Sequence, residues 1–416
     1  MSERNNWETF RPWPVYMMAA VVPISLAATS VSKLLVFLFG LVSAAGLVGA
    51  GQRLPQLRQL RTPAVILLML AALAFSLVYT TGPLLQALND FGKYGKLLVI
   101  PLVLVLVRTR REAMIGLVVY GAAQFLVVLT SYLLSMGLEL PWVMKDASQR
   151  LSIGTVYSSY IDQSIMTAGL AALCWNLRNR WPGRAGPAAA IAVAVLCAVN
   201  VLFFLPGRSG HAALLVAMAL ALYWAIPRHG KWVALVVPAA LLAAAMALSP
   251  QFSQRTYAIV TQSQAYLDGD RSPWSSAGTR LNYWYRALQA IEERPLLGSG
   301  VGSWNTEYRR LEGAQLNPHL KELRNPHQEY LMWGVQLGLV GIALLLAFFV
   351  QLARDAKRLD AVTRQAAYSM AAMLAVVCLF NSTIFDALIG DYFCVMIGLL
   401  LALGFTAAPA QSETNA

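Results

Sequence analysis

Long apolar runs recur along the whole chain, and no other feature of the sequence restricts its fold as strongly. A helix needs roughly 20 apolar residues to cross the hydrocarbon core of a bilayer. Hydrophobic residues make up 58% of the 416, and charged residues only 12%, which is too little charge to cover a soluble protein of this size. The sequence therefore predicts an all-α polytopic membrane protein.

The apolar runs predict twelve transmembrane helices. They are placed at residues 15–31, 32–50, 63–81, 97–107, 113–137, 160–177, 187–205, 211–226, 232–248, 330–353, 366–384 and 392–408. The intervening segment before the tenth run is too polar to cross the membrane. We therefore expect three parts: residues 1–248 with helices 1–9, a large periplasmic loop at 249–329, and residues 330–416 with helices 10–12 and a cytoplasmic tail.

Basic residues alternate between the predicted loops. Seventeen lie on one set of loops: Arg4, Arg11, Arg53, Arg58, Arg61, Arg108, Arg110, Arg111, Arg178, Arg180, Arg184, Arg228, Lys231, Arg354, Lys357, Arg358 and Arg364. The short loops of the other set carry six: Lys33, Lys93, Lys96, Lys145, Arg150 and Arg208. Because cytoplasmic loops are enriched in Lys and Arg, this asymmetry predicts that both termini are cytoplasmic. It also explains the net charge of +12 without nucleic acid as a partner.

The segment 249–329 is predicted to be folded and to face outward. It contains the stretch Arg280–Glu293, in which aromatic and apolar residues recur at near-helical spacing. A connection of this length is usually functional or disordered. Its tryptophan, tyrosine and leucine content argues against disorder.

His327 lies where the outer segment re-enters the membrane. Asn325 is a suitable N-cap residue, Pro326 suits the first helical position, and Gln328 falls at the capping-box site. These signals predict that His327 occupies the first turn of a membrane helix. The positive end of the helix dipole disfavours an imidazolium, so His327 is expected to be neutral and available as a general base. The alternative is a polar interfacial residue without a catalytic role.

Arg208 lies in a short outward turn, Pro206-Gly-Arg-Ser-Gly210, between two apolar runs. A guanidinium group at this depth is costly unless it meets an anion or a polar cavity. Gly207 and Gly210 are expected to leave room for a ligand, and Ser209 to cap the next helix. The alternative is an arginine that reaches the lipid headgroups.

Two further motifs are interpreted as turns. The run Gly298-Ser-Gly-Val-Gly302 resembles a phosphate-binding loop, but it follows no predicted strand and lacks the P-loop lysine. The pair Asp268 and Asp270 resembles a metal-binding pair, but the Rossmann-like domain that such a pair requires is not predicted. We therefore expect no metal site.

The order of these motifs resembles the O-antigen ligase family, within the wider group of O-antigen ligases, polymerases and protein O-oligosaccharyltransferases. Four features carry the resemblance: the Pro-Gly-Arg208-Ser-Gly turn, the outer segment with Gly278-Thr-Arg280, the run from Pro295 to Gly302, and the sequence His327-Gln-Glu-Tyr-Leu331. The motifs span about residues 200–345, and the topology is similar over the whole chain.

The resemblance implies a GT-C-type glycosyltransferase of the bacterial inner membrane, with its active site at the periplasmic face. The donor would be a glycan on undecaprenyl pyrophosphate and the acceptor the lipid A-core oligosaccharide, with no cofactor and no metal. His327 would be the base that deprotonates the acceptor hydroxyl. Arg208 and Arg280 would bind the pyrophosphate, with Arg286 and Arg324 as weaker candidates.

Other functions remain open from the sequence. Within the group, the modest loop at 138–160 favours a ligase over a polymerase, and the short C-terminal region favours it over a protein oligosaccharyltransferase. A lipid-linked-glycan flippase or other transporter would share the helices and outward arginines. A noncatalytic assembly protein would use the outer segment for docking.

Overall fold

A computed structural model describes residues 7–49, 59–143, 154–248, 250–269, 276–313 and 323–405, and all regular elements within these ranges are helical. Five of the described helices are long and apolar enough to span a membrane, and Thr62–Ser76 is a shorter apolar helix. The chain is therefore a helical membrane protein. Residues 406–416, Asp270 and the basic residues Arg4, Arg53, Arg58, Lys145 and Arg150 lie outside the described ranges.

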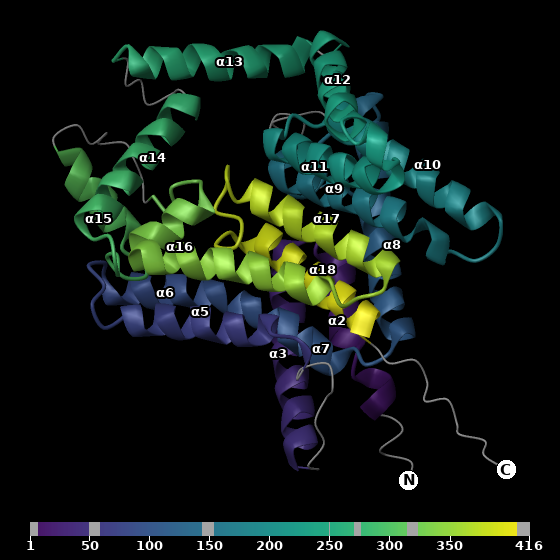
Figure 1. Cartoon of the computed structure of the whole chain (residues 1–416), viewed down its shortest axis with the longest axis horizontal. Coiled ribbons are helices and arrows are strands. Elements are labelled where there is room, and N and C mark those ends of the chain that lie inside the picture. Colours follow the sequence, from purple (N-terminus) through teal and green to yellow (C-terminus); the bar gives the residue numbers. More distant parts are fainter. Residues whose placement is uncertain are drawn as a thin grey trace.

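The helices follow one another along the chain as labelled in Figure 1. Their bounds are α2 Trp13–Val21, α3 Leu26–Gly49, α5 Thr62–Ser76, α6 Leu84–Tyr94, η1 Gly95–Leu98, α7 Val99–Leu106, α8 Arg110–Ser135, α9 Tyr160–Leu177, η3 Arg178–Arg180, α10 Ala185–Val199, η4 Asn200–Phe204, α11 Arg208–Ala225, η5 Arg228–Gly230, α12 Val233–Leu248, α13 Pro250–Leu267, α14 Ser276–Glu293, α15 Trp304–Glu312, α16 Glu329–Ala356, α17 Ala361–Val377 and α18 Ala387–Phe405.

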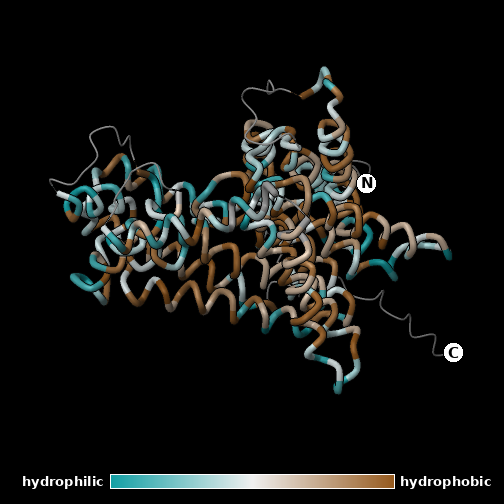
Figure 2. The backbone as a smooth tube through the Cα atoms, turned by 90° about the horizontal axis from the view of Figure 1, so that it is seen from above, coloured by the Kyte–Doolittle hydropathy of each residue, from teal (hydrophilic) through white to brown (hydrophobic). Residues whose placement is uncertain are grey.

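Helix α18 forms the centre of the bundle. It packs against α7, α8 and α17, and 83% of its span Ala387–Gly404 is buried, against 22–50% for the windows of the other four candidate spans. Apolar segments fill the middle of the molecule, while polar segments gather at its ends and loop tips (Figure 2).

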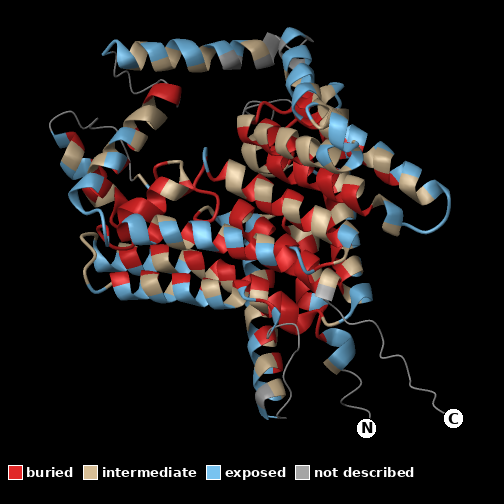
Figure 3. Cartoon of the chain, viewed as in Figure 1, coloured by how far each residue is buried: buried red, intermediate tan, exposed pale blue. Residues whose placement is uncertain are grey.

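The outward faces of the peripheral helices are apolar. Helix α5 exposes Leu67, Leu68 and Phe75 at 59%, 57% and 63% (Figure 3). A soluble monomer rarely leaves so continuous an apolar surface uncovered. The exposed faces are suited to contact with lipid.

The first two predicted spans differ from the observed helices. Helix α2 ends at Val21 and α3 begins at Leu26, so the break lies near Pro23 and not at residues 31–32. Pro23 has no backbone N–H to donate and disfavours helix in the residue before it. Lys33 accordingly lies inside α3, where its Nζ forms an ion pair with the buried Asp391 of α18 at 2.8 Å. Its prediction as a loop residue was wrong.

Helix α16 is interrupted at Gly338, whose φ of 63° and ψ of −149° are not helical. The glycine-rich turn packs into this break: Ser299 N donates to Val335 O at 2.8 Å, and Gly300 N to Gln336 O at 2.9 Å. A further bond runs from Leu339 N to Pro295 O at 2.7 Å. Backbone polar groups freed by a break in a membrane helix need such partners.

The glycine-rich run is thus a turn, as predicted, and its alternative as a phosphate loop is wrong. The N–H groups of Ser299, Gly300 and Val301 already donate to protein acceptors, the last to Ser76 Oγ at 3.0 Å. A Cβ on Gly298 would lie 2.6 Å from Gly338 N, so glycine is needed for this close approach.

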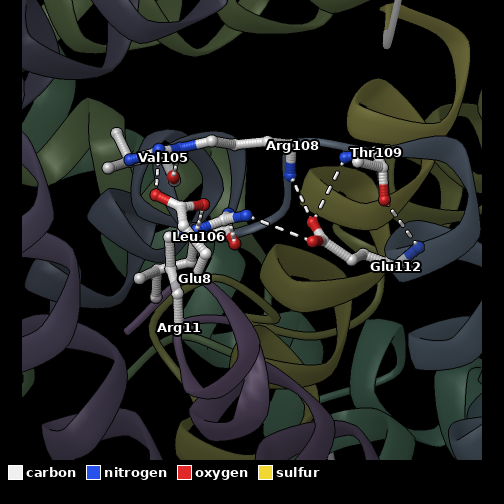
Figure 4. Close-up of polar contacts among 7 residues, drawn as sticks. All are labelled: Glu8, Arg11, Val105, Leu106, Arg108, Thr109 and Glu112. Atoms are coloured by element: carbon white, nitrogen blue, oxygen red, sulfur yellow. Dashed lines mark hydrogen bonds and ion pairs between the residues drawn. The ribbon is translucent and has the colours of Figure 1, made fainter. Parts of the chain in front are cut away.

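Two of the segments that were predicted to be cytoplasmic from their basic residues, the N-terminal segment and the α7–α8 loop, contact each other at one end of the bundle. Arg11 is 2% exposed and contacts both Glu8 and Glu112, each at 3.1 Å, and Arg108 Nη1 contacts Glu8 at 3.0 Å (Figure 4). Thr109 and Glu112 form a capping box at the start of α8. Residues near the N-terminus therefore lie at the same end as the α7–α8 loop.

Two other contacts belong to the same end. Asp360, before α17, forms an ion pair with Arg180, and Asp355 Oδ2 accepts from the backbone N–H of Arg61 at 2.9 Å. Both carboxylates lie near the C-terminal end of α16 or just beyond it. The turn before α16 and the turn between α17 and α18 lie at the opposite end of the bundle. The length of α16 or of α17 separates each of them from the α16–α17 loop, which contains Asp360.

The described part of the outer segment, residues 250–269, 276–313 and 323–328, contains the three helices α13, α14 and α15. Helix α13 extends from α12 to α14, and α14 packs against α13, α15 and α16 (Figure 1). The predicted helical stretch Arg280–Glu293 falls within α14, so this prediction is confirmed. Helix α14 thus connects the polar segment to the first turns of α16.

Replacing Gly338 with alanine should destabilise the protein. A Cβ there would lie 2.5 Å from Pro295 O, and the backbone conformation is one that costs a non-glycine residue about 1–3 kcal/mol. Gly92→Ala is the matched control, because its added Cβ meets nothing within 4 Å. Thermal unfolding in detergent should show a lower midpoint for Gly338→Ala alone; equal midpoints would contradict the role of the break.

Candidate active site

His327 lies just before α16 and not in its first turn, so the predicted capping register was wrong. The N-cap is Gln328, whose Oε1 accepts from Leu331 N at 2.6 Å, and the helix begins at Glu329. Asn325 does not cap the helix: its Oδ1 accepts from His327 N at 2.9 Å. This local turn holds His327 at a φ of 54°, the one positive φ among the described non-glycine residues. Strained backbone of this kind is often found at functional sites.

The imidazole of His327 is kept neutral chiefly by burial. Burial and, to a smaller extent, the positive charge of Arg280 together lower the pKa of His327 to about 4. The neutral state was expected from the helix dipole, but these two causes account for the shift. A neutral imidazole can accept a proton, which is the requirement for a general base.

Helix α14 supplies two neighbours of His327. The ring of Tyr283 stacks on the imidazole, with centroids 6.2 Å apart and planes 20° apart. Arg280 precedes Tyr283 by nearly one helical turn, and its Nη1 donates to Phe380 O at 3.3 Å. The amphipathic stretch of the outer segment thus places a guanidinium group beside the imidazole.

Arg208 is the first residue of α11. It lies next to the turn between α17 and α18, which also contains Phe380. The adjacent Ser209 accepts from Asn381 Nδ2 at 2.6 Å, one residue after the carbonyl that Arg280 contacts. Tyr160 provides a second link: its carbonyl packs against Gly207, and its side chain acts electrostatically on Arg280. The starts of α9 and α11 therefore lie close to Arg280.

The glycines beside Arg208 serve packing. A Cβ on Gly207 or Gly210 would lie 2.1 or 2.2 Å from Ser164 Oγ of α9. The prediction that they leave room for a ligand was wrong, because α9 occupies that space. The predicted cap is also wrong: the N-cap is Gly207, without a side-chain bond, and Ser209 bonds instead to Asn381.

The two weaker arginine candidates point to other surroundings. Arg286 Nε forms an ion pair with the buried Glu312 of α15 at 2.8 Å, which joins α14 to α15. Arg324 is exposed, three residues before His327. Arg280 and Ser209, the neighbour of Arg208, both contact the α17–α18 turn, whereas the ion pair of Arg286 joins α14 to α15.

The α17–α18 turn, residues 378–386, was missed by sequence reasoning. Glu329 is fully buried and its Oε2 accepts from Ile384 N at 2.9 Å and Phe385 N at 3.2 Å, while its Oε1 accepts from Trp333 Nε1 at 3.0 Å. Buried Lys96 donates to the carbonyl of Phe385 at 3.2 Å. These partners are far apart in sequence. The only local signal for the contact was an acidic residue, Glu329, at the start of an apolar helix.

Asp386, in the same turn, adds a carboxyl group to the site. Its Oδ1 accepts from Asn325 Nδ2 at 3.3 Å, so it supports the residue that binds the His327 backbone. Burial, and after it the charge of Asp162, raise the pKa of Asp386 to about 6, although Lys96 and Lys93 act to lower it. No three His, Cys, Asp or Glu side chains in the described ranges are grouped to hold a metal ion.

Comparison with protein families agrees with this arrangement. Residues 193–346 match the family model described as O-antigen ligase. This domain of the chain is therefore similar to O-antigen ligases. The domain contains Arg208, Arg280, Tyr283 and His327, whereas Tyr160 and the α17–α18 turn lie outside it. No curated protein matches the chain.

Replacing Glu329 with glutamine should destabilise the site end of the bundle. The amide oxygen of glutamine can still accept from the N–H groups of the α17–α18 turn. Its NH₂ group would then face the indole N–H of Trp333, and two donors cannot bond to each other. Loss of a hydrogen bond to a charged group costs about 1.5–3 kcal/mol. Chemical unfolding in detergent should show this loss, and the exposed Glu292→Gln of α14 should unfold as the unmodified protein does. Equal stability of both variants would contradict the contact.

Proposed function

We propose that the chain is an O-antigen ligase that transfers a glycan from undecaprenyl pyrophosphate to the lipid A-core oligosaccharide. The observation that carries this proposal is the neutral imidazole of His327 beside the guanidinium group of Arg280, within an O-antigen ligase domain. The similarity to O-antigen ligases indicates a glycosyl-transferring enzyme, and these two groups supply the base and the cation that such a reaction requires.

The reaction is a single inverting displacement. The acceptor hydroxyl oxygen attacks the anomeric carbon of the donor glycan, and His327 takes the hydroxyl proton. The bond between that carbon and the phosphate oxygen breaks, and undecaprenyl pyrophosphate leaves with the bonding electrons. Arg280 and Arg208 bind the developing negative charge, as fixed cations do in other transferases. An in-line displacement needs a base near the attacking oxygen and cations near the leaving phosphate, and the proposal assigns these tasks to His327 and to the two arginines.

Arg208 and Arg280 are the pyrophosphate ligands in this proposal, and Arg286 and Arg324 are secondary. The contacts of Ser209 and Arg280 with neighbouring residues of one turn support the first pair. The ion pair of Arg286 with Glu312 gives it a structural task already.

The site is proposed to face the periplasm from the inner membrane, with twelve spans, both termini in the cytoplasm and residues 249–329 outside. The two ends of the bundle support this topology: predicted basic loops meet at one end, and the candidate site lies at the other. We propose that membrane lipids contact the exposed apolar faces and that the fold is of the GT-C type.

His327→Ala should abolish glycan transfer, and Arg280→Ala and Arg208→Ala should reduce it strongly. Loss of a positioned base lowers the rate on the order of 10²–10⁴-fold, and loss of a cation that binds the leaving group lowers it by a similar order. Transfer is measured in purified membranes with a defined undecaprenyl-pyrophosphate glycan and a lipid A-core acceptor. His229→Ala and Arg309→Ala are matched controls at exposed positions and should stay active. Transfer that survives His327→Ala and Arg208→Ala would refute the enzymatic assignment.

The same assay identifies the product. A ligase attaches the glycan to lipid A-core, whereas a polymerase lengthens the lipid-linked glycan without that acceptor. We expect transfer only when lipid A-core is present. Lengthening of the donor in its absence would favour the polymerase instead.

Glycan transfer should continue in EDTA. The arginines are proposed to bind the charge for which other transferases use a divalent ion. The rate is compared before and after chelation, and again after Mg²⁺ is added back. A loss that Mg²⁺ restores would contradict the metal-independent mechanism.

A further inference from the structure

Tyr283 lies in a position to hold the imidazole of His327 without using either ring nitrogen. The two rings are stacked at 6.2 Å and 20°, so Tyr283 covers one face of the imidazole. The nitrogens lie at the edge of the imidazole, and a stacked ring does not bond to them. Stacking therefore restricts the ring without occupying the nitrogen that would accept a proton.

The ring of Tyr283 is itself fixed by two aromatic neighbours from α15. Trp304 meets it edge-on at 6.1 Å and 77°, and Tyr308 at 5.2 Å and 90°. Trp304, Tyr308 and Tyr283 are 1%, 2% and 5% exposed. Edge-to-face contacts of this kind favour one ring orientation over others. The outer segment thus presents a rigid surface to His327.

We propose that Tyr283 is a positioning residue for the catalytic base, one that orients the His327 imidazole toward the acceptor hydroxyl. This inference rests on the proposed function, since it assigns Tyr283 a task only if His327 accepts a proton. A general base must lie within hydrogen-bond reach of its proton, and small displacements of catalytic groups cost large factors in rate.

Burial by Tyr283 also helps to keep the base unprotonated. The pKa of His327 is lowered mainly by burial, to which a stacked ring contributes directly. Among the described residues, Arg280 acts on the imidazole and Tyr283 contacts it, both from α14; Glu329 of α16 and Asp386 of the α17–α18 turn are titratable groups on the neighbouring elements. Burial raises the pKa of Tyr283 to about 12, so its hydroxyl stays neutral. Removal of the Tyr283 ring should let water reach the imidazole and raise the pKa of His327 toward 6.5.

The kinetic test compares Tyr283→Phe with Tyr283→Ala in the glycan-transfer assay. The phenylalanine keeps the stack, and kcat should stay within about twofold of the unmodified protein. The alanine should lower kcat on the order of 10- to 100-fold with little change in KM for the donor. The pH at which kcat falls on the acid side should rise for alanine and not for phenylalanine.

A second test measures the pKa of the His327 imidazole without an activity assay. The rate at which diethyl pyrocarbonate modifies His327 is followed against pH by mass spectrometry of the modified peptide, in full-length protein in detergent. Neutral imidazole reacts, so the midpoint reports its pKa. The midpoint should lie higher in Tyr283→Ala than in Tyr283→Phe, while exposed His229 should give the same midpoint in both. Tyr283→Leu, which keeps an apolar side chain in the cluster, replaces the alanine variant if that variant does not fold.

The two proposals fail in different ways. Full activity of His327→Ala would refute the proposed function. If His327→Ala is inactive but Tyr283→Ala retains kcat and both pH midpoints, the role of Tyr283 is refuted alone. An increase in KM with unchanged kcat would also refute it, because Tyr283 would then contribute to substrate binding.

Discussion

The candidate site depends on the contact of one buried carboxylate with the turn between α17 and α18. Glu329 accepts two backbone N–H groups from this turn, and its own N–H donates to Cys378 O at 2.9 Å. The same turn provides the carbonyl for Arg280 and the amide for Ser209. A single carboxylate, two residues after His327, thus ties the segment carrying the base to the turn that receives both arginine-bearing helices. Polar groups buried this deeply are stable only when they are fully bonded.

The outer segment is packed against α16 and is not a separate domain. Its glycine-rich turn bonds to the backbone of α16, and α14 brings Arg280 and Tyr283 to the start of the same helix. The cationic and aromatic neighbours of His327 therefore come from polar sequence, while the base itself lies at the beginning of a membrane helix. The polar segment between α12 and α16 thus contributes two of the side chains that surround His327.

Local patterns were sufficient for much of the architecture and for the principal candidate residues. The helical character, the amphipathic stretch in α14, and the positions of Arg208 and His327 beside polar turns all follow from residues close in sequence. Three kinds of feature did not. The first residue of α16 was one of these features, because the sequence offers suitable start residues at Asn325, Pro326 and Gln328. Asn325 instead bonds to His327 N, and the helix begins after Gln328. The break near Pro23 interrupts an otherwise apolar run, and the hydrogen bond of Ala28 N to Ser25 Oγ at 3.3 Å marks it only in the folded chain. The contacts of Glu329, Asp386 and Tyr283 join segments far apart in the chain, and spacing carries no information about such pairs.

The interruption of α16 also bears on how the chain is assembled. Until the turn 298–301 is in place, the carbonyls of Val335 and Gln336 lack the partners that the finished protein gives them. The turn precedes α16 in the order of synthesis, so both partners of these bonds exist once α16 has been made. The broken helix therefore depends for its backbone hydrogen bonds on a segment that was made before it.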